Sequence, residues 1–420
     1  MPVDQLPMPP SQLPHPPGNL MRPLDQALVE LLVFAVPLNQ FEQVSTFDAD
    51  NRVLAQDVVA SLDVPAHNNS AMDGYAVRCT DWASADSTLH VNQRIAAGSC
   101  GQPLAAMSAA RIFTGAPIPD GADAVTPQED CMVSGANLQL ATQPKLGKWI
   151  RKRGEDVARG SKVLLIGELL APESIGLAAS IGIDKLLVAA PVRVALFSTG
   201  DELVMPGDVA PQDMKPGAIY NSNRFFLRAL LKRLGCLVTD MGIVPDQFEA
   251  TKTALASASC SHDLILTSGG VSVGEEDHIK PAVQALGRLD LWQIAIKPGK
   301  PFAYGKINAA HFIGLPGNPV SSFVTFLLLV RPFVRKLQGA TKLAPDCIAA
   351  CAHFDWPKAD KRREFLRVKR NLVGGLDLFD NQSSGVLTSA VWADGLVDNR
   401  AGNTIAHGDV VQFIPFASLM

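Results

Sequence analysis

Residues 264–274, Leu-Ile-Leu-Thr-Ser-Gly-Gly-Val-Ser-Val-Gly, decide the fold class of this chain. A short apolar run that ends in a glycine-rich turn is typical of a strand buried inside a parallel sheet. Strand and helix patterns alternate on both sides of it, from Pro191 to Leu337. This alternation predicts a doubly wound α/β domain over residues 191–337, with ligand-binding loops at the carboxyl ends of parallel strands.

Two helix patterns and a β-rich block precede this domain. Apolar residues at helical spacing predict a helix that starts at Leu24 and ends at Pro37. A second helix is expected from Pro172 to Ile181, and we expect it to pack on the first. Between them, residues 57–156 contain short apolar runs separated by Gly, Pro and Asp clusters, which is typical of short strands and turns.

The sequence therefore predicts a multidomain chain of α/β and β parts. A mostly-β domain at 57–156 is inserted into a domain split over 20–56 and 157–190. After residue 337 short strand patterns return, which predicts a small β domain at 338–420. The first 19 residues are rich in proline, and we expect them to form a flexible tail.

Composition excludes several functional classes. The 420 residues exceed a typical domain of about 150 residues, so several domains are expected. A formal charge of −4 with no dominant basic stretch argues against nucleic-acid binding. Seven scattered cysteines without a C-x-x-C pair indicate reduced thiols in the cytoplasm. No apolar run approaches the roughly 20 residues of a membrane span, so no membrane association is expected.

Two loops of the predicted α/β domain carry acidic side chains. Ser198–Glu202 offers hydroxyls and backbone amides beside two carboxylates, although a capped turn would look the same. The loop 268–274 leads into Glu275, Glu276 and Asp277, and its glycines would let backbone N–H groups approach an anion closely. These carboxylates would repel a phosphate unless a divalent cation lay between them, so the pattern favours a magnesium–phosphate site.

Two further loops could bind anions. The turn at 297–301, Lys-Pro-Gly-Lys-Pro, presents two ammonium groups that suit a phosphate or a tetrahedral oxyanion, with a solvated charge pair as the alternative. The turn at 314–319 ends a strand and precedes a helix that starts at Pro319, after Asn318, and the free N–H groups of that helix would point at the same crevice. A purely structural turn is the alternative there.

A serine-hydrolase interpretation competes with these. Gly270–Gly274 matches the G-x-S-x-G nucleophile elbow with Ser272 as nucleophile, in the right strand-to-helix context. The required acid and histidine downstream would have to come from Asp346, His353 or His407, which lie in the predicted C-terminal β domain. No HGGG-type oxyanion loop precedes the elbow.

Several long motifs in one order identify a family resemblance. From about Leu24 to Phe416 the chain resembles the molybdopterin molybdenumtransferase family. The resemblance is carried by NSAMDGYAV, FTGAPIPDGADAV, RKRGED, STGDEL, SGGVSVGEED, KPGKPF, GLPGNPVS and QSSGVLTSAVWADGL. It implies a homodimer of elongated four-domain subunits, in which a pterin-binding α/β domain faces the inserted β domain of the partner chain.

The same resemblance implies an activity and a set of site residues. Adenylylated molybdopterin and molybdate would give the molybdenum cofactor and AMP, with Mg²⁺ present and an upstream adenylyltransferase as a candidate partner. Catalytic roles are expected for Asp73, Glu202, Asp246 and Asp277, with Glu202 and Asp277 also as metal ligands. Together, the loops and the motifs predict that the substrate is bound by Thr114, Arg151, Asp156, Ser268, Gly269, Gly270, Ser272, Lys297, Lys300, Pro301, Asn318, Arg367 and Ser384.

Three functional classes thus compete. An oxyanion-transferring enzyme would convert adenylylated molybdopterin and molybdate. An esterase would react at Ser272. A pterin-binding or scaffolding module would bind without turnover. The acidic and lysine-bearing loops favour turnover.

Overall fold

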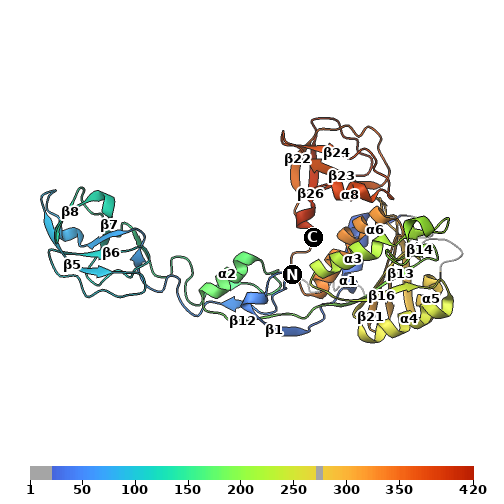
Figure 1. Ribbon diagram of the computed structural model, residues 1–420, viewed down its shortest axis with the longest axis horizontal. Coiled ribbons are helices and arrows are strands. Elements are labelled where there is room, and N and C mark those ends of the chain that lie inside the picture. The colour runs from blue at the N-terminus through green and yellow to red at the C-terminus, as the bar shows by residue number, and fades with distance from the viewer. Residues whose placement is uncertain (1–20, 271–277) are drawn as a thin grey trace, which may run out of the picture. The chain divides into compact units, whose positions relative to one another are not determined.

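A computed structural model describes residues 21–270 and 278–420 (Figure 1). The chain divides into two compact units, one of residues 42–188 and one that joins the segments before and after it. None of the helices in the described ranges is both long and apolar enough to cross a bilayer.

A six-stranded sheet with helices on both faces forms the centre of the α/β domain (Figure 1). Its strands, in spatial order, are β16 (Leu237–Val244), β13 (Arg193–Thr199), β17 (Leu264–Ser268), β21 (Ala310–Leu315), β20 (Pro301–Ile307) and β18 (Gly287–Gln293). Its helices are α3 (Ser222–Arg233), α4 (Phe248–Ser261), α5 (Ile279–Leu286), α6 (Pro319–Thr325) and α7 (Arg331–Leu337), the last two joined by a π-helical turn, Phe326–Val330.

Alternate residues of each central strand enter two separate cores. Leu264 and Leu266 of β17 pack with α3, α6 and α7, whereas Ile265 packs with α4 and α5. Because successive side chains of a strand point to opposite faces, this near-continuous apolar run covers both sides of the sheet. The predicted doubly wound fold is confirmed.

One strand departs from the predicted parallel arrangement. β20 runs antiparallel to both of its neighbours, β21 and β18. The turn between Ile307 and Ala310, with Asn308 at φ 54°, is far too short for the crossover that parallel neighbours require. As a consequence β18 runs parallel to β21, and the 297–301 turn lies at the same sheet edge as the carboxyl ends of β13, β17 and β21.

The two helices expected to pack together belong to different cores. In α1 (Leu24–Phe34), the buried residues Leu24, Ala27 and Leu31 join the core around α7, and Phe34 stacks on Tyr304 with ring centroids 4.7 Å apart. α2 (Pro172–Ser180) packs within residues 42–188. The predicted pairing is therefore wrong, because the apolar face of α1 continues the larger α/β core.

The C-terminal region forms the predicted small β domain. Its sheet contains β19 (Ile296–Lys297), β23 (Arg363–Arg370), β24 (Gly375–Leu378), β22 (Ile348–Ala352), β26 (Val410–Pro415) and β25 (Gly395–Asn399), and α8 (Leu387–Trp392) follows β24. β19 belongs to the α/β domain by sequence but pairs with β23. The C-terminal domain is thereby attached directly to the 297–301 turn.

Residues 42–188, which include the predicted inserted domain at 57–156, are mostly β. Their main sheet contains β7 (Ala124–Pro127), β4 (Gly74–Val77), β6 (Ser108–Ile112), β5 (Thr88–Ile95), β9 (Asn137–Leu140) and β8 (Cys131–Ser134). Two-stranded pairs are formed by β1 (Phe41–Ser45) with β12 (Lys185–Ala189), β2 (Val58–Val59) with β11 (Lys162–Leu164), and β3 (Asn69–Ser70) with β10 (Ile150–Arg151).

Candidate functional site

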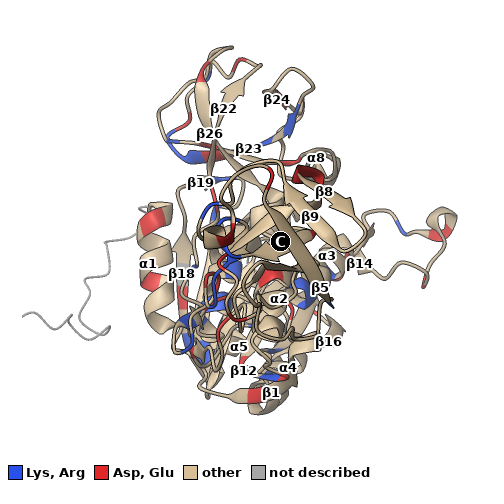
Figure 2. Ribbon diagram, turned by 90° about the vertical axis from the view of Figure 1, so that its left-hand side faces the viewer, with Lys and Arg blue, Asp and Glu red and all other residues tan. Residues whose placement is uncertain are grey.

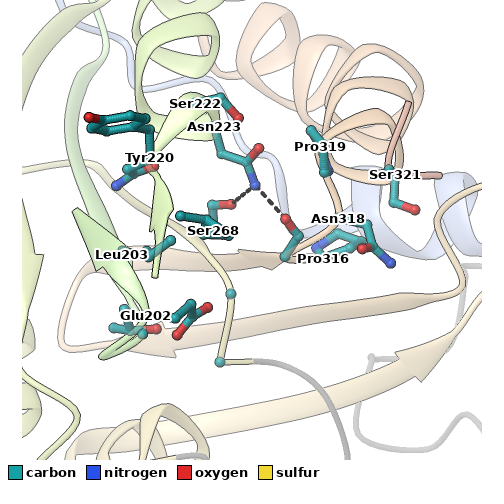
Figure 3. Close-up of a pocket in the computed structure, with 18 of the residues that line it drawn as sticks. Glu202, Leu203, Tyr220, Ser222, Asn223, Ser268, Pro316, Asn318, Pro319 and Ser321 are labelled. Atoms are coloured by element: carbon teal, nitrogen blue, oxygen red, sulfur yellow. Dashed lines mark hydrogen bonds between the residues drawn. The ribbon is translucent and has the colours of Figure 1, made fainter. Parts of the chain in front are cut away.

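A pocket of about 690 Å³ lies at the carboxyl edge of the α/β sheet (Figure 3). Its walls come from the loops after β13, β16, β17 and β21, from the start of α3, and from Gly385 of the C-terminal domain. Of the residues predicted from the sequence, it brings together Glu202, Asp246, Ser268, Gly269, Gly270, Pro301 and Asn318. Parallel strands explain this convergence, because their carboxyl ends meet at one edge.

The loop after β17 needs glycine at two positions. Gly269 and Gly270 have φ angles of 96° and 68°, a region that residues with a Cβ rarely adopt. A Cβ on Gly270 would lie 2.5 Å from the Ile279 side chain, and one on Gly269 would lie 3.0 Å from the Thr199 carbonyl oxygen. The loop therefore brings its backbone unusually close to the neighbouring strand end.

Asn223 links two of the pocket loops and was missed by the sequence analysis. Its Nδ2 donates to the Ser268 hydroxyl oxygen and to the Gly317 carbonyl oxygen, both at 2.7 Å (Figure 3). The side chain is buried at the start of α3. The polar run Tyr220-Asn221-Ser222-Asn223 ahead of an amphipathic helix was the available signal.

Asn221 presents a buried donor at the pocket wall. Its Oδ1 accepts the Arg224 N–H at 3.2 Å and so caps α3, but its Nδ2 has no partner among the described residues. Only 2% of Asn221 is exposed. An unpaired buried donor costs about 1–3 kcal/mol, so this amide destabilises the fold as long as it has no acceptor. The amino end of α3 adds a favourable potential for an anion.

Two carboxylates line the same pocket. Glu202 follows β13 and Asp246 follows β16. Carboxylate oxygens are the ligands that Mg²⁺ prefers, and this ion is usually held by one or two of them together with substrate phosphates. Residues 21–270 and 278–420 contain no group of three or more His, Cys, Asp or Glu placed to hold a metal. Glu202 and Asp246 thus fit a magnesium ion only if the substrate supplies further ligands, and the predicted ligand Asp277 lies outside the described residues.

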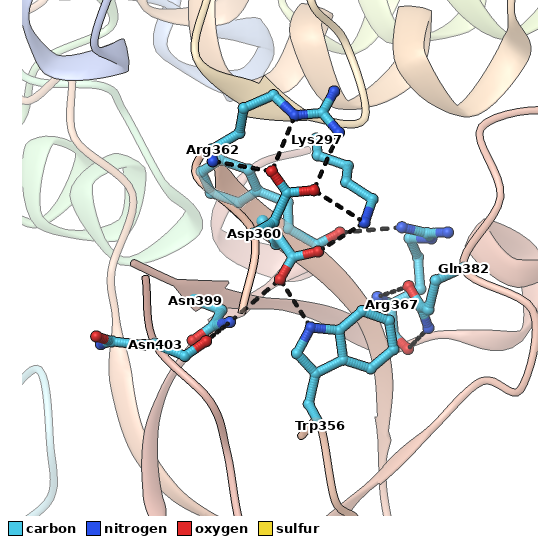
Figure 4. Close-up of polar contacts among 10 residues, drawn as sticks. Lys297, Trp356, Asp360, Arg362, Arg367, Gln382, Asn399 and Asn403 are labelled. Atoms are coloured by element: carbon cyan, nitrogen blue, oxygen red, sulfur yellow. Dashed lines mark hydrogen bonds and ion pairs between the residues drawn. The ribbon is translucent and has the colours of Figure 1, made fainter. Parts of the chain in front are cut away.

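Lys297 is paired with carboxylates of the C-terminal domain. Its Nζ lies 2.9 Å from Glu364 and 3.3 Å from Asp360 (Figure 4). Partial burial lowers the pKa of Lys297, but these two acids outweigh it and raise the pKa above its usual value. The Arg362 side chain is the main reason that the pKa of Asp360 is lowered. The predicted anion-binding charge of Lys297 is therefore already balanced within the protein.

Basic and acidic residues stand side by side at β19 (Figure 2). We call the group of Lys297, Trp356, Asp360, Arg362 and Glu364 the Lys297 cluster. Glu364 is 1% exposed and also accepts the Trp356 indole N–H at 2.7 Å. Lys300, three residues further on, is exposed and has no ion-pair partner in the part of the chain that the structure describes. Of the two predicted lysines, Lys300 is the one available to a ligand.

Arg367 is a buried cation without a carboxylate partner among the described residues. It is 1% exposed and donates to the Ser389 hydroxyl and to the Phe365 carbonyl oxygen, both at 3.1 Å. Burial lowers the pKa of Arg367 to about 10. It does not line the pocket, and neither does Ser384. The Ser384 carbonyl oxygen accepts the Val320 N–H at 2.9 Å, which places the neighbouring Gly385 at the pocket.

The inserted domain carries the remaining predicted residues, Asp73, Thr114, Arg151 and Asp156. One oxygen of Asp73 accepts both the backbone N–H and the hydroxyl of Thr114 at 2.7 Å, and these bonds lower the pKa of Asp73. Arg151 pairs with Asn69, and Ser70 bonds to the Ala116 carbonyl oxygen in the loop after Thr114. The backbone N–H of Asp156 bonds to Val64. Strand pairing and hydrogen bonds thus join the segments around Asn69, Thr114 and Arg151.

Three family models match the chain in order. They are the MoeA N-terminal region (domain I and II) at residues 22–182, a probable molybdopterin binding domain at 195–336, and the MoeA C-terminal region (domain IV) at 349–416. A curated molybdopterin molybdenumtransferase of Haemophilus influenzae is 41% identical over 408 residues, which cover 95% of this chain and 100% of that protein.

The chain belongs to the molybdopterin molybdenumtransferase family. A second member, from Nostoc sp., is 34% identical over 86% of each chain. The crystal structure of a molybdopterin biosynthesis moeA protein from Pyrococcus horikoshii OT3 superimposes with a TM-score of 0.82 at 27% identity, over 94% of this chain and 100% of that one. The predicted fold class and the predicted family are confirmed. The described pocket lies within the match to the molybdopterin binding domain, apart from Gly385.

The esterase alternative is not favoured by these findings. The predicted nucleophile Ser272 lies outside the described residues, and no histidine lines the described pocket. His353 and His407 stack on one another in the C-terminal domain with ring centroids 5.2 Å apart. Asp346 pairs with Lys342 at 2.7 Å. The three candidates for the acid and the histidine of a catalytic triad thus have partners of their own in the described structure.

Proposed function

We propose that this protein inserts molybdate into adenylylated molybdopterin, giving the molybdenum cofactor and AMP. Its family is one of transferases in molybdenum cofactor biosynthesis. The observation that carries the proposal is the convergence of the predicted motif residues on one pocket inside the molybdopterin-binding match. A pocket of about 690 Å³ also falls within the range of small-molecule sites.

The polar groups of the pocket suit an anionic substrate. Asn221 supplies an unpaired amide donor, and α3 directs its amino end at the pocket. The exposed ammonium of Lys300 would attract the pyrophosphate or the incoming oxyanion. Arg367, as a buried cation with no carboxylate partner in the described ranges, is proposed to favour molybdate nearby, with Ser384 beside it. These groups would position the reactants for transfer.

Magnesium is proposed to be held by Glu202 and Asp246, with Asp277 as a further candidate ligand. When bound, the ion would neutralise charge on the phosphate oxygens. The chain's own contribution is to fix the two carboxylates on adjacent strand-end loops. A third protein ligand is unnecessary, because substrate phosphates and water complete the coordination of Mg²⁺ at such sites.

A homodimer is also proposed, in which the inserted domain of one subunit serves the pocket of its partner. Its support is the outer face of α1 and the segment after it, where Val29, Val33 and Val36 are 66%, 53% and 65% exposed. Neighbouring exposed apolar side chains are typical of the centre of a subunit interface. The upstream adenylyltransferase is the proposed source of the substrate.

Reconstitution with purified components tests the transfer. Purified protein, adenylylated molybdopterin and molybdate should yield the molybdenum cofactor together with AMP, and removal of Mg²⁺ should suppress both products. Asp213→Asn, an exposed acid outside the pocket, is the control for acid substitutions. Binding of the pterin without any AMP release would contradict the proposed function.

Mixed dimers test the proposed sharing of sites. Asp73→Asn and Glu202→Gln would each inactivate a homodimer. A mixture of the two subunits should regain about a quarter of wild-type activity, because about half of randomly formed dimers are mixed and each has one intact site. No recovery in a mixture that is shown to contain mixed dimers would contradict this arrangement.

A further inference from the structure

Asn223 makes two hydrogen bonds, and together they determine whether the Ser268 hydroxyl accepts or donates. The Gly317 carbonyl oxygen can only accept, so the Asn223 atom that faces it must be the amide nitrogen. The same nitrogen lies 2.7 Å from the Ser268 hydroxyl oxygen. At this contact the serine therefore accepts, and its single hydrogen is left for another partner.

Among the described residues, none accepts the hydrogen of the Ser268 hydroxyl, which leaves a ligand in the pocket as its acceptor. Ser268 lines the pocket and is 4% exposed, and its hydroxyl donates to no described residue. The loop that holds Gly317 lies close to the loop that follows Ser268, because a Cβ on Gly317 would come within 4.0 Å of the Gly269 Cα. Asn223 thus holds two loops that are already in close contact, and it leaves one oriented hydroxyl donor on the pocket wall.

We propose that Asn223 is a positioning residue that fixes Ser268 as a hydrogen-bond donor to an acceptor oxygen of the bound substrate. The acceptor is a phosphate, carbonyl or oxyanion oxygen, and a group that can only donate is disfavoured at this place. The inference rests on the proposed function for the identity of the substrate. It adds a role for Asn223, and a direction for the Ser268 bond, that neither the motifs nor the family resemblance supplies.

Asn223→Asp reverses the polarity of this arrangement with almost no change in shape. The carboxylate would accept the Ser268 hydrogen and turn it away from the pocket, and it would face the Gly317 carbonyl oxygen unfavourably. We expect KM for adenylylated molybdopterin to rise about tenfold with a smaller change in kcat, since one hydrogen bond to a charged group is lost on binding. Ser268→Ala should raise KM by a similar factor.

The double variant separates positioning from general structural damage. If Asn223 acts through Ser268, adding Asn223→Asp to Ser268→Ala should raise KM by less than about threefold more, because the hydroxyl is already gone. The matched control is Asn308→Asp, which breaks a similar amide-to-serine bond, Asn308 Nδ2 to Ser259 Oγ at 2.8 Å, outside the pocket. That control should leave KM unchanged.

Two results would overturn the inference while leaving the proposed function intact. One is a wild-type enzyme that turns over normally and an Asn223→Asp variant with unchanged KM. The other is a double variant in which the two single effects multiply in full. If Asn223→Asp does not fold, Asn223→Ala replaces it in the same cycle. Absence of turnover by the wild type would instead reject the proposed function.

Discussion

The pocket and the Lys297 cluster both contain carboxylates, but the two regions differ in whether a cation pairs with them. In the cluster, Lys297 pairs with Glu364 at 2.9 Å and with Asp360 at 3.3 Å, both from the C-terminal domain. In the pocket, Asn221 keeps an unpaired donor, and Glu202 has no Lys or Arg within ion-pair distance in residues 21–270 and 278–420. The comparison teaches that a charged motif residue is available to a ligand only where the protein has left it without a partner.

Glu202→Gln should give the largest effect on activity. The change removes a pocket carboxylate that no described cation compensates, and we expect cofactor formation to fall by a factor of about 10³. The melting temperature should stay the same, because no ion pair is broken. AMP release and thermal unfolding measure the two quantities, and a variant with more than a third of wild-type turnover would remove Glu202 from the chemistry.

Glu364→Ala should instead act on stability. It leaves the Trp356 indole N–H without its acceptor and Lys297 with Asp360 as its remaining acid partner, and a buried donor left unpaired costs about 1–3 kcal/mol. Denaturant unfolding followed by tryptophan fluorescence should show a lowered midpoint. An unchanged midpoint would mean that the Lys297 cluster does not hold the C-terminal domain in place.

A buried histidine that has a hydrogen-bond partner lies at the opposite edge of the α/β sheet. His311 is 8% exposed and its Nδ1 lies 2.9 Å from the Tyr304 hydroxyl oxygen. Burial lowers the pKa of His311 from 6.5 to about 4. Between these values the unfolded chain binds a proton that the folded chain does not, so stability falls as the pH falls, by about 3 kcal/mol in total.

His311→Gln should remove this pH dependence. The variant loses stability at neutral pH, but its free energy of unfolding should decline less than that of the wild type between about pH 6.5 and pH 4. Denaturant unfolding at several pH values measures the slope. Equal slopes in both proteins would show that His311 is not the group that titrates.

The smallest effects are expected from substitution of the two lysines in the 297–301 turn. Lys300→Met should raise KM for the substrate about tenfold with no loss of stability, because its ammonium has no described partner. Lys297→Met should lower the unfolding midpoint, because it strands Glu364. If Lys297→Met raised KM and left the unfolding midpoint unchanged, the distinction between the paired Lys297 and the unpaired Lys300 would be contradicted.

Local patterns were sufficient to predict the strand-end loops. The apolar run 264–268 and its glycines predicted the strand and the turn, and the pocket lies where parallel strands predict it. Asn221 caps α3, a role that Asn commonly takes just before a helix. Each of these features depends on residues that are close in sequence, which is why periodicity and turn chemistry could reveal them.

Long-range partners could not be predicted in the same way. Nothing near Lys297 in the sequence indicates Glu364, which comes 67 residues later and reaches it only through the pairing of β19 with β23. The packing of α1 on α7 has the same origin, because amphipathic helices do not specify which core they join. The role of Asn223 could not be predicted for a different reason. A polar residue in the first turn of a helix usually indicates capping.

A crystal structure of Glu202→Gln with bound adenylylated molybdopterin tests the central claim most directly. The account predicts the pyrophosphate between the loops at Ser268 and Asn318, with an acceptor oxygen within hydrogen-bond distance of the Ser268 hydroxyl and of the Asn221 amide. Substrate bound at the Lys297 cluster, or anywhere outside the pocket at the sheet edge, would contradict it.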